Sequence, residues 1–298
     1  MADALRMDAY IRAMRQTIKP GSVVVDLGSG PGVFALMACQ LGARRVFAIE
    51  PNDVIQIGRD AAREHGFDDR IEFIQQLSTE ITLPERADVV VSDLRGILPC
   101  YGHHLPSIVD ARSRFLAPGG VLIPARDRLW IAVVEVPEKY DEIVKPWNDS
   151  NLLSGRNLAL NSWGKIRVKP ENLLSESVCW QEIDYHNVTE SNFRENMSLT
   201  AAREGTAHGF VVWFDADLGE GIGFSNAPGA EELIYGQGFF PFAKPINVAS
   251  GDRVDVRLEA RLIGDHYVWR WNDQSTLLGV PFSTSELRKR AKTHTHES

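Results

Sequence analysis

The stretch VVVDLGSGPGVFALMA, residues 23–38, decides how the first half of the chain is interpreted. An apolar, β-branched run passes through Asp26 into a glycine-rich turn, and apolar residues at helical spacing follow at once. Glycine lets the backbone turn tightly and approach a ligand without a clash from Cβ. A dinucleotide-binding fingerprint requires glycine one position later, where this chain has Val33. The order of strand, loop and helix therefore predicts a cofactor-binding loop.

Outward from this loop, residues 1–125 alternate between short apolar runs and segments of helical periodicity. Strand-like runs cover 22–27, 44–50, 70–75, 87–93 and 120–124, and helical patterns cover 32–43, 52–66 and 105–116. Strands that alternate with helices need crossover connections, which produce a parallel sheet covered on both faces. We therefore predict a doubly wound, Rossmann-like α/β domain, whose ligands bind beyond the carboxyl ends of the strands.

The pattern changes at about residue 126, where convincing helical segments become scarce. Strand-like segments cover 127–136, 177–184, 207–218, 252–262 and 266–271. Alternation of apolar and polar residues in DVRLEARL, 255–262, indicates a half-buried antiparallel strand. We predict a β-rich, barrel-like domain over 126–285 for substrate binding and dimerisation. The stretch 148–165 fits neither helix nor strand, and the polar tail 286–298 is expected to be frayed.

Composition excludes several classes of function. The net charge is −8 and no basic block is present, which argues against a nucleic-acid partner. The three cysteines are far apart in the sequence, so neither a disulfide framework nor a metal site is expected. No signal peptide and no apolar run of about 18 residues occurs, so we expect a cytoplasmic protein without a membrane partner.

The second predicted strand ends in an acid that suits a nucleoside cofactor. Glu50 lies eighteen residues after Gly32, and a carboxylate there can accept hydrogen bonds from both ribose hydroxyls. The loop pattern Asp-x-Gly-x-Gly-x-Gly matches the first motif of S-adenosylmethionine-dependent methyltransferases, in which the loop lies against the amino-acid end of the cofactor. Dinucleotide binding remains the alternative.

Beyond these motifs, the chain resembles the protein arginine methyltransferase family. The resemblance rests on residues 23–50, on ARSRFLAPGGVLIPARDRLWIAVVE at 111–135, and on the β-rich second half; it covers nearly all of 3–271. It implies S-adenosylmethionine as cofactor and S-adenosylhomocysteine as product. The implied cofactor-binding residues are Arg6, Asp26, Gly28, Ser29, Gly30, Gly32, Glu50, Pro51, Ser78 and Thr79.

Within that set the resemblance gives Arg6 a contact with the cofactor carboxylate, although a solvated helix arginine is the alternative. It places Ser78 and Thr79 along the adenine, where the family usually has a carboxylate at the second position. The family's helices that precede Arg6 have no counterpart here. We therefore expect either a late start of the chain or a more open pocket.

The family pattern fails where the substrate should bind. SDLRGILPCYGHH, 92–104, aligns with a loop whose two glutamates bind the substrate guanidinium bidentately. Here the first position is Asp93 and the second is Gly102, and residues 233–235 (Leu-Ile-Tyr) replace a Thr-His-Trp loop. We therefore predict a methyltransferase whose substrate is not ordinary protein arginine, but a small metabolite or an unusual protein side chain.

Asp93 and His104 are the candidate catalytic residues. Asp93 ends its strand beside the expected sulfonium, and His104 aligns with a family methionine near the transferable methyl group. A histidine there can accept a proton near neutral pH, or it can simply cap the following helix. Arg95 can pair with Asp93, bind an acidic substrate or form a surface salt bridge.

Two other functions remain open. One is a non-catalytic relative that binds the cofactor and acts as a binding protein. The other is a protein arginine methyltransferase with an altered clamp. Family members commonly form dimers through an arm that projects from the barrel, and 148–165 is the candidate for that arm in a homodimer.

Overall fold

The computed structural model describes residues 3–149 and 153–273. The chain divides into two compact units. The first comprises residues up to 127 together with 182–189 and 215–225, and the second comprises 128–181, 190–214 and the residues from 226 onward. The predicted polar tail lies outside the described residues.

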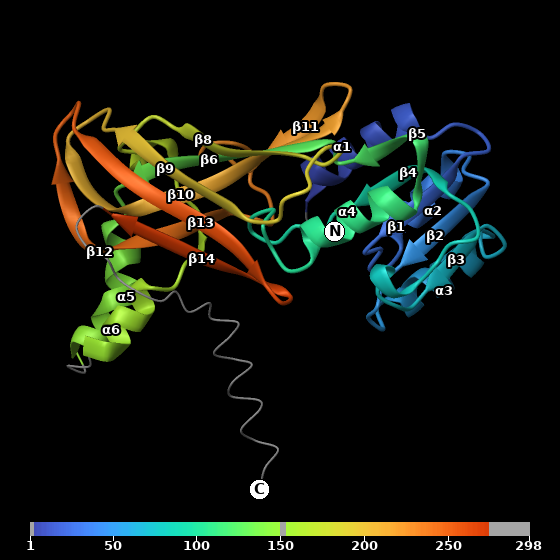
Figure 1. The fold of residues 1–298 in the computed structure, drawn as a ribbon, viewed down its shortest axis with the longest axis horizontal. Helices are drawn as coiled ribbons and strands as arrows, with labels where there is room; N and C mark the ends of the chain where they lie inside the picture. Colours follow the sequence, from blue (N-terminus) through green and yellow to red (C-terminus); the bar gives the residue numbers. More distant parts are fainter. Residues whose placement is uncertain (1–2, 150–152, 274–298) are drawn as a thin grey trace, which may run out of the picture. The chain divides into compact units, whose positions relative to one another are not determined.

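The first unit is built on a parallel sheet. Its elements in chain order are α1 (Ala4–Thr17), β1 (Val23–Leu27), α2 (Val33–Gln40), β2 (Arg45–Ile49), α3 (Ile55–His65), β3 (Ile71–Ile74), the 3-10 turn η1 (Ser78–Glu80), β4 (Ala87–Ser92), α4 (His104–Arg114) and β5 (Leu116–Ile123). The strand order is β3-β2-β1-β4-β5 and every neighbouring pair is parallel (Figure 1). The predicted doubly wound sheet is confirmed.

This order makes β1 the central strand and places the topological switch between β1 and β4, where such sheets bind ligands. All five residues of β1 are buried, which explains its run of three valines. Strand β4 ends at Ser92, so Asp93 follows directly at the carboxyl edge of the sheet.

The elements after β5 are mainly strands. They are β6 (Arg126–Val134), α5 (Pro137–Asp149), α6 (Leu153–Leu160), β7 (Gly164–Ile166), η2 (Pro170–Asn172), β8 (Val178–Asp184), β9 (Phe193–Thr200), β10 (Gly205–Gly219), β11 (Ile222–Ser225), β12 (Gln237–Val248), β13 (Arg253–Ile263) and β14 (His266–Asp273). One sheet has the order β7-β12-β10-β6-β8, with β11 paired to β10, and a second has the order β14-β13-β9. The β-rich second half is thus confirmed as a pair of sheets.

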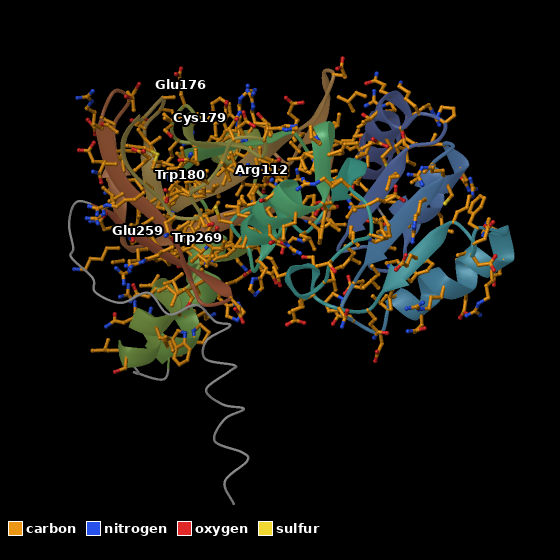
Figure 2. All side chains as sticks on the ribbon, turned by 45° about the vertical axis from the view of Figure 1, so that its right-hand side comes forward. Arg112, Glu176, Cys179, Trp180, Glu259 and Trp269 are labelled. Carbon is orange, nitrogen blue, oxygen red and sulfur yellow. The ribbon has the colours of Figure 1, made fainter. Side chains whose placement is uncertain are left out.

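Alternation along β8 shows how this half builds its core. Cys179 is exposed whereas its neighbour Trp180 is buried (Figure 2). The ring of Trp180 lies 5.5 Å from that of Trp269, whose ring lies 5.4 Å from Phe240. Trp269, in the predicted strand 266–271, is therefore a core residue.

The second half also contains two helices that the sequence pattern does not predict. The two helices lie side by side (Figure 1). Helix α5 buries Tyr140 and Val144, and α6 adds Leu160 to the same small apolar cluster. The stretch 148–165 contains the end of α5, all of α6 and the start of β7. Helix α6 has only eight residues and includes Ser, Gly and Asn, so its periodicity is too short and too weak to detect.

Within the described residues, no helix has the length and apolar character needed to cross a membrane.

Candidate active site

The predicted cofactor loop adopts a conformation that requires glycine. Gly28, Gly30 and Gly32 have φ values of 72°, 52° and 77°, in the left-handed region that other residues rarely adopt. The amides of Gly28 and Ser29 both donate to the carbonyl of Ile49 at 2.9 Å, which fixes the loop to the end of β2. Helix α2 then begins directly after Gly32.

Glu50 is held beside this loop. Its Oε1 accepts from the amide of Asn52 at 2.9 Å, and its Oε2 accepts from the amide of Gly30 at 3.2 Å. The side-chain hydroxyl of Ser29 is buried and has no hydrogen-bond partner among the described residues. A nearby polar ligand can satisfy that hydroxyl, so the residues present fit a polar nucleoside cofactor.

Asp26 supports the loop from below. It is 1% exposed, and its Oδ2 accepts from the amide of Ala35 at 2.9 Å in the first turn of α2. Burial, together with the nearby charge of Glu50, raises the pKa of Asp26 to about 7. Its contact is with protein backbone, so the structure gives Asp26 a structural role in shaping the loop.

The segment predicted to lie along adenine forms the short turn η1. Arg114 of α4 donates to the carbonyl of Ser78 at 2.7 Å and to that of Ile81 at 2.6 Å. Ser78 is buried, whereas Thr79 and Pro51 are exposed. One arginine thus fixes the backbone of this segment from the neighbouring helix.

The carboxylate of Asp93 is engaged by two arginines. Arg6 of α1 donates through Nη1 to its Oδ2, and Arg95 donates through Nη1 to its Oδ1 at 3.2 Å. Arg6 also donates through Nε to Asp3 at 3.1 Å. Gly102 has a φ of 49°, and a Cβ added there would have no neighbour within 4 Å. The first clamp position is therefore paired with protein arginines, and the second is open space.

Arg95 belongs to a buried polar network, which differs from the surface salt bridge considered above. Its side chain is 0% exposed, and its Nε and Nη2 each donate to Asp127 at 2.7 Å. Its Nη1 also donates to the hydroxyl of Tyr10 at 2.6 Å, and that hydroxyl donates to the carbonyl of Ser92 at 2.9 Å. Burial opposes the charge of Arg95, but Asp127 raises the pKa of the guanidinium above its usual value.

His104 is the first residue of α4 and is 1% exposed. Its Nε2 lies 2.7 Å from the hydroxyl of Tyr185, which donates to Oδ2 of Asp127 at 2.5 Å. Burial and the charge of Arg95 lower the pKa of His104 well below its usual value. Burial therefore favours the neutral imidazole, and the catalytic assignment of His104 stays a prediction. His103 stands at the helix start and makes no side-chain cap hydrogen bond.

Sequence reasoning missed Tyr10, Asp127 and Tyr185. The sequence does contain a signal that two of these residues, Asp127 and Tyr185, are buried. Asp127 shares the phase of the buried strand residues Leu129 and Ile131, and Tyr185 is two residues after the buried Ile183. A carboxylate in phase with core residues implies a buried partner, although the sequence does not say which residue that partner is.

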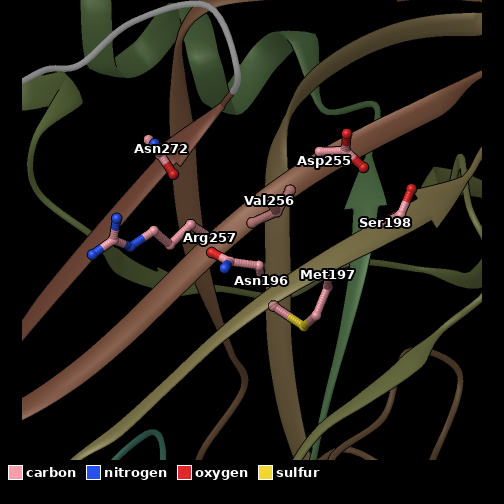
Figure 3. A pocket seen from close by; sticks show the side chains of 7 residues that line it. All are labelled: Asn196, Met197, Ser198, Asp255, Val256, Arg257 and Asn272. Carbon is pink, nitrogen blue, oxygen red and sulfur yellow. The ribbon is translucent and has the colours of Figure 1, made fainter.

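The second unit has a pocket of its own. A pocket of about 420 Å³ on β9, β13 and β14 is lined by Asn196, Met197, Ser198, Asp255, Val256, Arg257 and Asn272 (Figure 3). None of the predicted site residues lines it. Tyr235, in the stretch that replaces the Thr-His-Trp loop, packs its ring edge-on against Phe214 with centroids 5.2 Å apart. Its visible role is packing.

Taken together, the doubly wound sheet, the glycine loop at the end of β1 and the acid at the end of β2 define the class of S-adenosylmethionine-dependent methyltransferases. Comparisons with known proteins agree. Residues 125–263 match the arginine methyltransferase oligomerization subdomain, and residues 8–125 match the ribosomal protein L11 methyltransferase (PrmA) family.

Two individual relatives that match the chain are arginine methyltransferases. The arginine N(omega)-methyltransferase of Streptomyces achromogenes is 31% identical over 269 residues, covering 86% of this chain and 73% of that protein. The protein arginine N-methyltransferase 1 of Dictyostelium discoideum is 28% identical over 263 residues, covering 85% and 77%. The Trypanosoma brucei PRMT1 enzyme-prozyme complex with AdoHcy shares the fold with a TM-score of 0.82 at 20% identity, over 94% of this chain and 93% of that chain.

The chain belongs to the arginine methyltransferase family. It is an S-adenosylmethionine-dependent methyltransferase.

Proposed function

We propose that the chain transfers the methyl group of S-adenosylmethionine to an acceptor other than ordinary protein arginine, either a small molecule or an unusual protein side chain. The observation that carries this proposal is the pairing of Asp93 with Arg6 and Arg95, together with the open position at Gly102. A guanidinium clamp needs carboxylate oxygens that are available to accept bidentate hydrogen bonds.

Charge strengthens this reasoning. Each oxygen of Asp93 already accepts from an arginine, so a substrate guanidinium would bring a third cation to one carboxylate. Two unit charges 4 Å apart interact by about 1 kcal/mol in water and about 4 kcal/mol near a protein surface. The repulsion of a substrate guanidinium by the two arginines is therefore comparable with its attraction to the single carboxylate of Asp93. A neutral or anionic acceptor avoids that repulsion.

When bound, S-adenosylmethionine supplies an electrophilic methyl group on a cationic sulfur. Glu50 and the hydroxyl of Ser29 would hold the cofactor at the glycine loop, and the backbone of Ser78 would hold its adenine. Arg6 is the candidate for its carboxylate. Methyl transfer is an in-line displacement, so the remaining task of the protein is to position the acceptor and exclude water. Asp93, at the end of β4, is the residue we assign to that positioning.

A second candidate is the guanidinium of a small molecule. The relative from Streptomyces achromogenes is named an arginine N(omega)-methyltransferase, without reference to a protein, and it is 31% identical. A free amino acid brings its own carboxylate, which Arg6 can pair with because its side chain is 17% exposed. The two candidates differ only in the acceptor atom, so one assay separates them.

The test measures transfer of labelled methyl from S-adenosylmethionine to a panel of acceptors: an arginine-rich peptide, free arginine, and neutral and anionic small molecules with hydroxyl or amine groups. Glu50→Ala is the control, because loss of its ribose contact should remove transfer to every acceptor. The proposal predicts transfer to at least one acceptor other than the arginine-rich peptide. Preference for the arginine-rich peptide contradicts it, and transfer to free arginine alone favours the second candidate. Cofactor binding with no transfer at all would favour a binding protein.

We also propose a homodimer. The match of residues 125–263 to a subdomain named for oligomerization supports this, as does the helical pair α5 and α6 at the predicted arm. Small-angle scattering should give twice the mass of the chain, and a concentration-independent monomer would contradict the proposal.

A further inference from the structure

We propose that Tyr185, held by Asp127 and Arg95, fixes His104 as the tautomer with its proton on Nε2, so that Nδ1 accepts a hydrogen bond from an N–H or O–H group of the methyl acceptor. This inference rests on the proposed function, because it names a contact for the same acceptor. His104 is then the residue that touches substrate, and Tyr185, Asp127 and Arg95 are positioning residues.

The tautomer follows from counting protons on one hydroxyl. Asp127 accepts from Nε and Nη2 of Arg95, both at 2.7 Å, so both carboxylate oxygens face a permanently charged guanidinium. Such a carboxylate is ionised and can only accept. The single proton of the Tyr185 hydroxyl therefore goes to Asp127, 2.5 Å away.

Once that proton is used, the Tyr185 oxygen can only accept from its other neighbour. The neighbour is Nε2 of His104 at 2.7 Å, which must therefore be the protonated nitrogen. The T-shaped packing of the two rings, with an interplanar angle of 82°, holds this arrangement. The hydrogen-bonded network has four members, and all of them are buried: Arg95, Asp127, Tyr185 and His104. Water therefore cannot exchange with the partners within this network.

The other ring nitrogen is left without a partner. Nδ1 of His104 is buried and has no hydrogen-bond partner among residues 3–149 and 153–273. Because burial and Arg95 lower the pKa of His104, Nδ1 carries a lone pair and no proton. An unpaired buried acceptor is destabilising, and a bound donor removes that penalty.

The network connects this acceptor to the end of β4. Arg95 donates both to Asp127 and, at 3.2 Å, to Asp93, which also receives Arg6. The residue assigned to the substrate and the orphan nitrogen thus belong to one continuous hydrogen-bonded chain at the carboxyl edge of the sheet. A donor group on the methyl acceptor is the partner that satisfies Nδ1 at that edge.

Nitrogen-15 NMR of the full-length protein tests the tautomer without turnover. The sequence has eight histidines, and the signals of His104 are assigned by their loss in His104→Gln. We expect a protonated Nε2 and an unprotonated Nδ1 in the wild type. The protein is then saturated with S-adenosylhomocysteine, and the acceptor that the panel identifies is added in its unmethylated form. Binding of that acceptor should shift the Nδ1 signal. A protonated Nδ1, or an Nδ1 signal unmoved at saturating acceptor, overturns the inference.

Tyr185→Phe tests the positioning role, and Tyr140→Phe is the matched control. Tyr140 is also a buried tyrosine whose ring packs against a histidine, His208, at 5.5 Å, and its hydroxyl donates to the carbonyl of Phe242. Tyr185→Phe should lose the single tautomer and reduce kcat/KM for the acceptor about 10- to 100-fold, with unchanged affinity for S-adenosylmethionine. Tyr140→Phe should leave both readouts unchanged.

Wild-type kcat/KM in Tyr185→Phe overturns the positioning role. If Tyr185→Phe loses cofactor affinity as well, the residue is only structural and the inference is likewise overturned. If no acceptor in the panel is methylated, the proposed function fails by itself, and the nitrogen spectrum still supports or overturns the tautomer.

Discussion

Replacement of Gly28 by alanine tests the structure of the cofactor loop most sharply when it is compared with the same change at Gly30. Both glycines have positive φ values, 72° and 52°, so each alanine is strained by about 1–2 kcal/mol. A Cβ on Gly28 would also lie 2.1 Å from Cδ2 of Leu94, whereas a Cβ on Gly30 meets nothing within 4 Å. Overpacking of that kind costs about 1–3 kcal/mol more.

We therefore expect Gly30→Ala to lower the free energy of unfolding by about 1–2 kcal/mol and Gly28→Ala to lower it by about 2–5 kcal/mol. Chemical denaturation measures both, and calorimetry with S-adenosylhomocysteine shows whether the loop still binds. The double variant Gly28→Ala/Leu94→Ala should recover the difference, with a coupling energy of about 1–3 kcal/mol. Equal losses in the two single variants, or no coupling to Leu94, would refute the packing described for this loop.

Two further predictions concern residues that support the cofactor site. The pKa of Asp26 rises from 3.8 to about 7, so its contribution to stability is complete below pH 3.8 and is lost as the pH rises through 7. Asp26→Asn should remove that loss, so the free energy of unfolding of the variant should rise relative to wild type by up to about 4 kcal/mol between pH 4 and pH 8. Chemical denaturation at each pH measures this difference. A difference that does not change with pH would contradict the raised pKa of Asp26. Arg114→Ala should lower the free energy of unfolding by about 1–3 kcal/mol and weaken cofactor binding, because it frees the carbonyls of Ser78 and Ile81. Arg112→Ala is its control on the same helix, because Arg112 donates instead to the carbonyls of Tyr185 and Val188. Equal cofactor affinities in the two variants would refute the role of Arg114.

Much of the fold was predictable because its signals are local. The valines of β1, the glycines after it and the alternation in β13 each report their structure within a few residues. Helix α6 escaped prediction because eight residues that include Ser, Gly and Asn give little periodicity, and its stability comes from packing against α5.

The candidate site was predictable only in part, for a different reason. The departures at Asp93 and Gly102 are visible in the sequence, since they are changes at single positions. The pairing of Arg95 with Asp127, 32 residues away, and of His104 with Tyr185, 81 residues away, depends on how the chain folds back. That pairing decides the charge state of His104, so its expected titration near neutral pH could not be checked from the sequence.

The central claim is that Asp93 is occupied by protein arginines and does not bind a substrate guanidinium. Calorimetric titration of an arginine-rich peptide into the protein saturated with S-adenosylhomocysteine tests this directly, with Asp93→Asn as the matched variant. We predict no saturable binding of the peptide to the wild type at millimolar concentration. Stoichiometric binding that Asp93→Asn abolishes would contradict the claim.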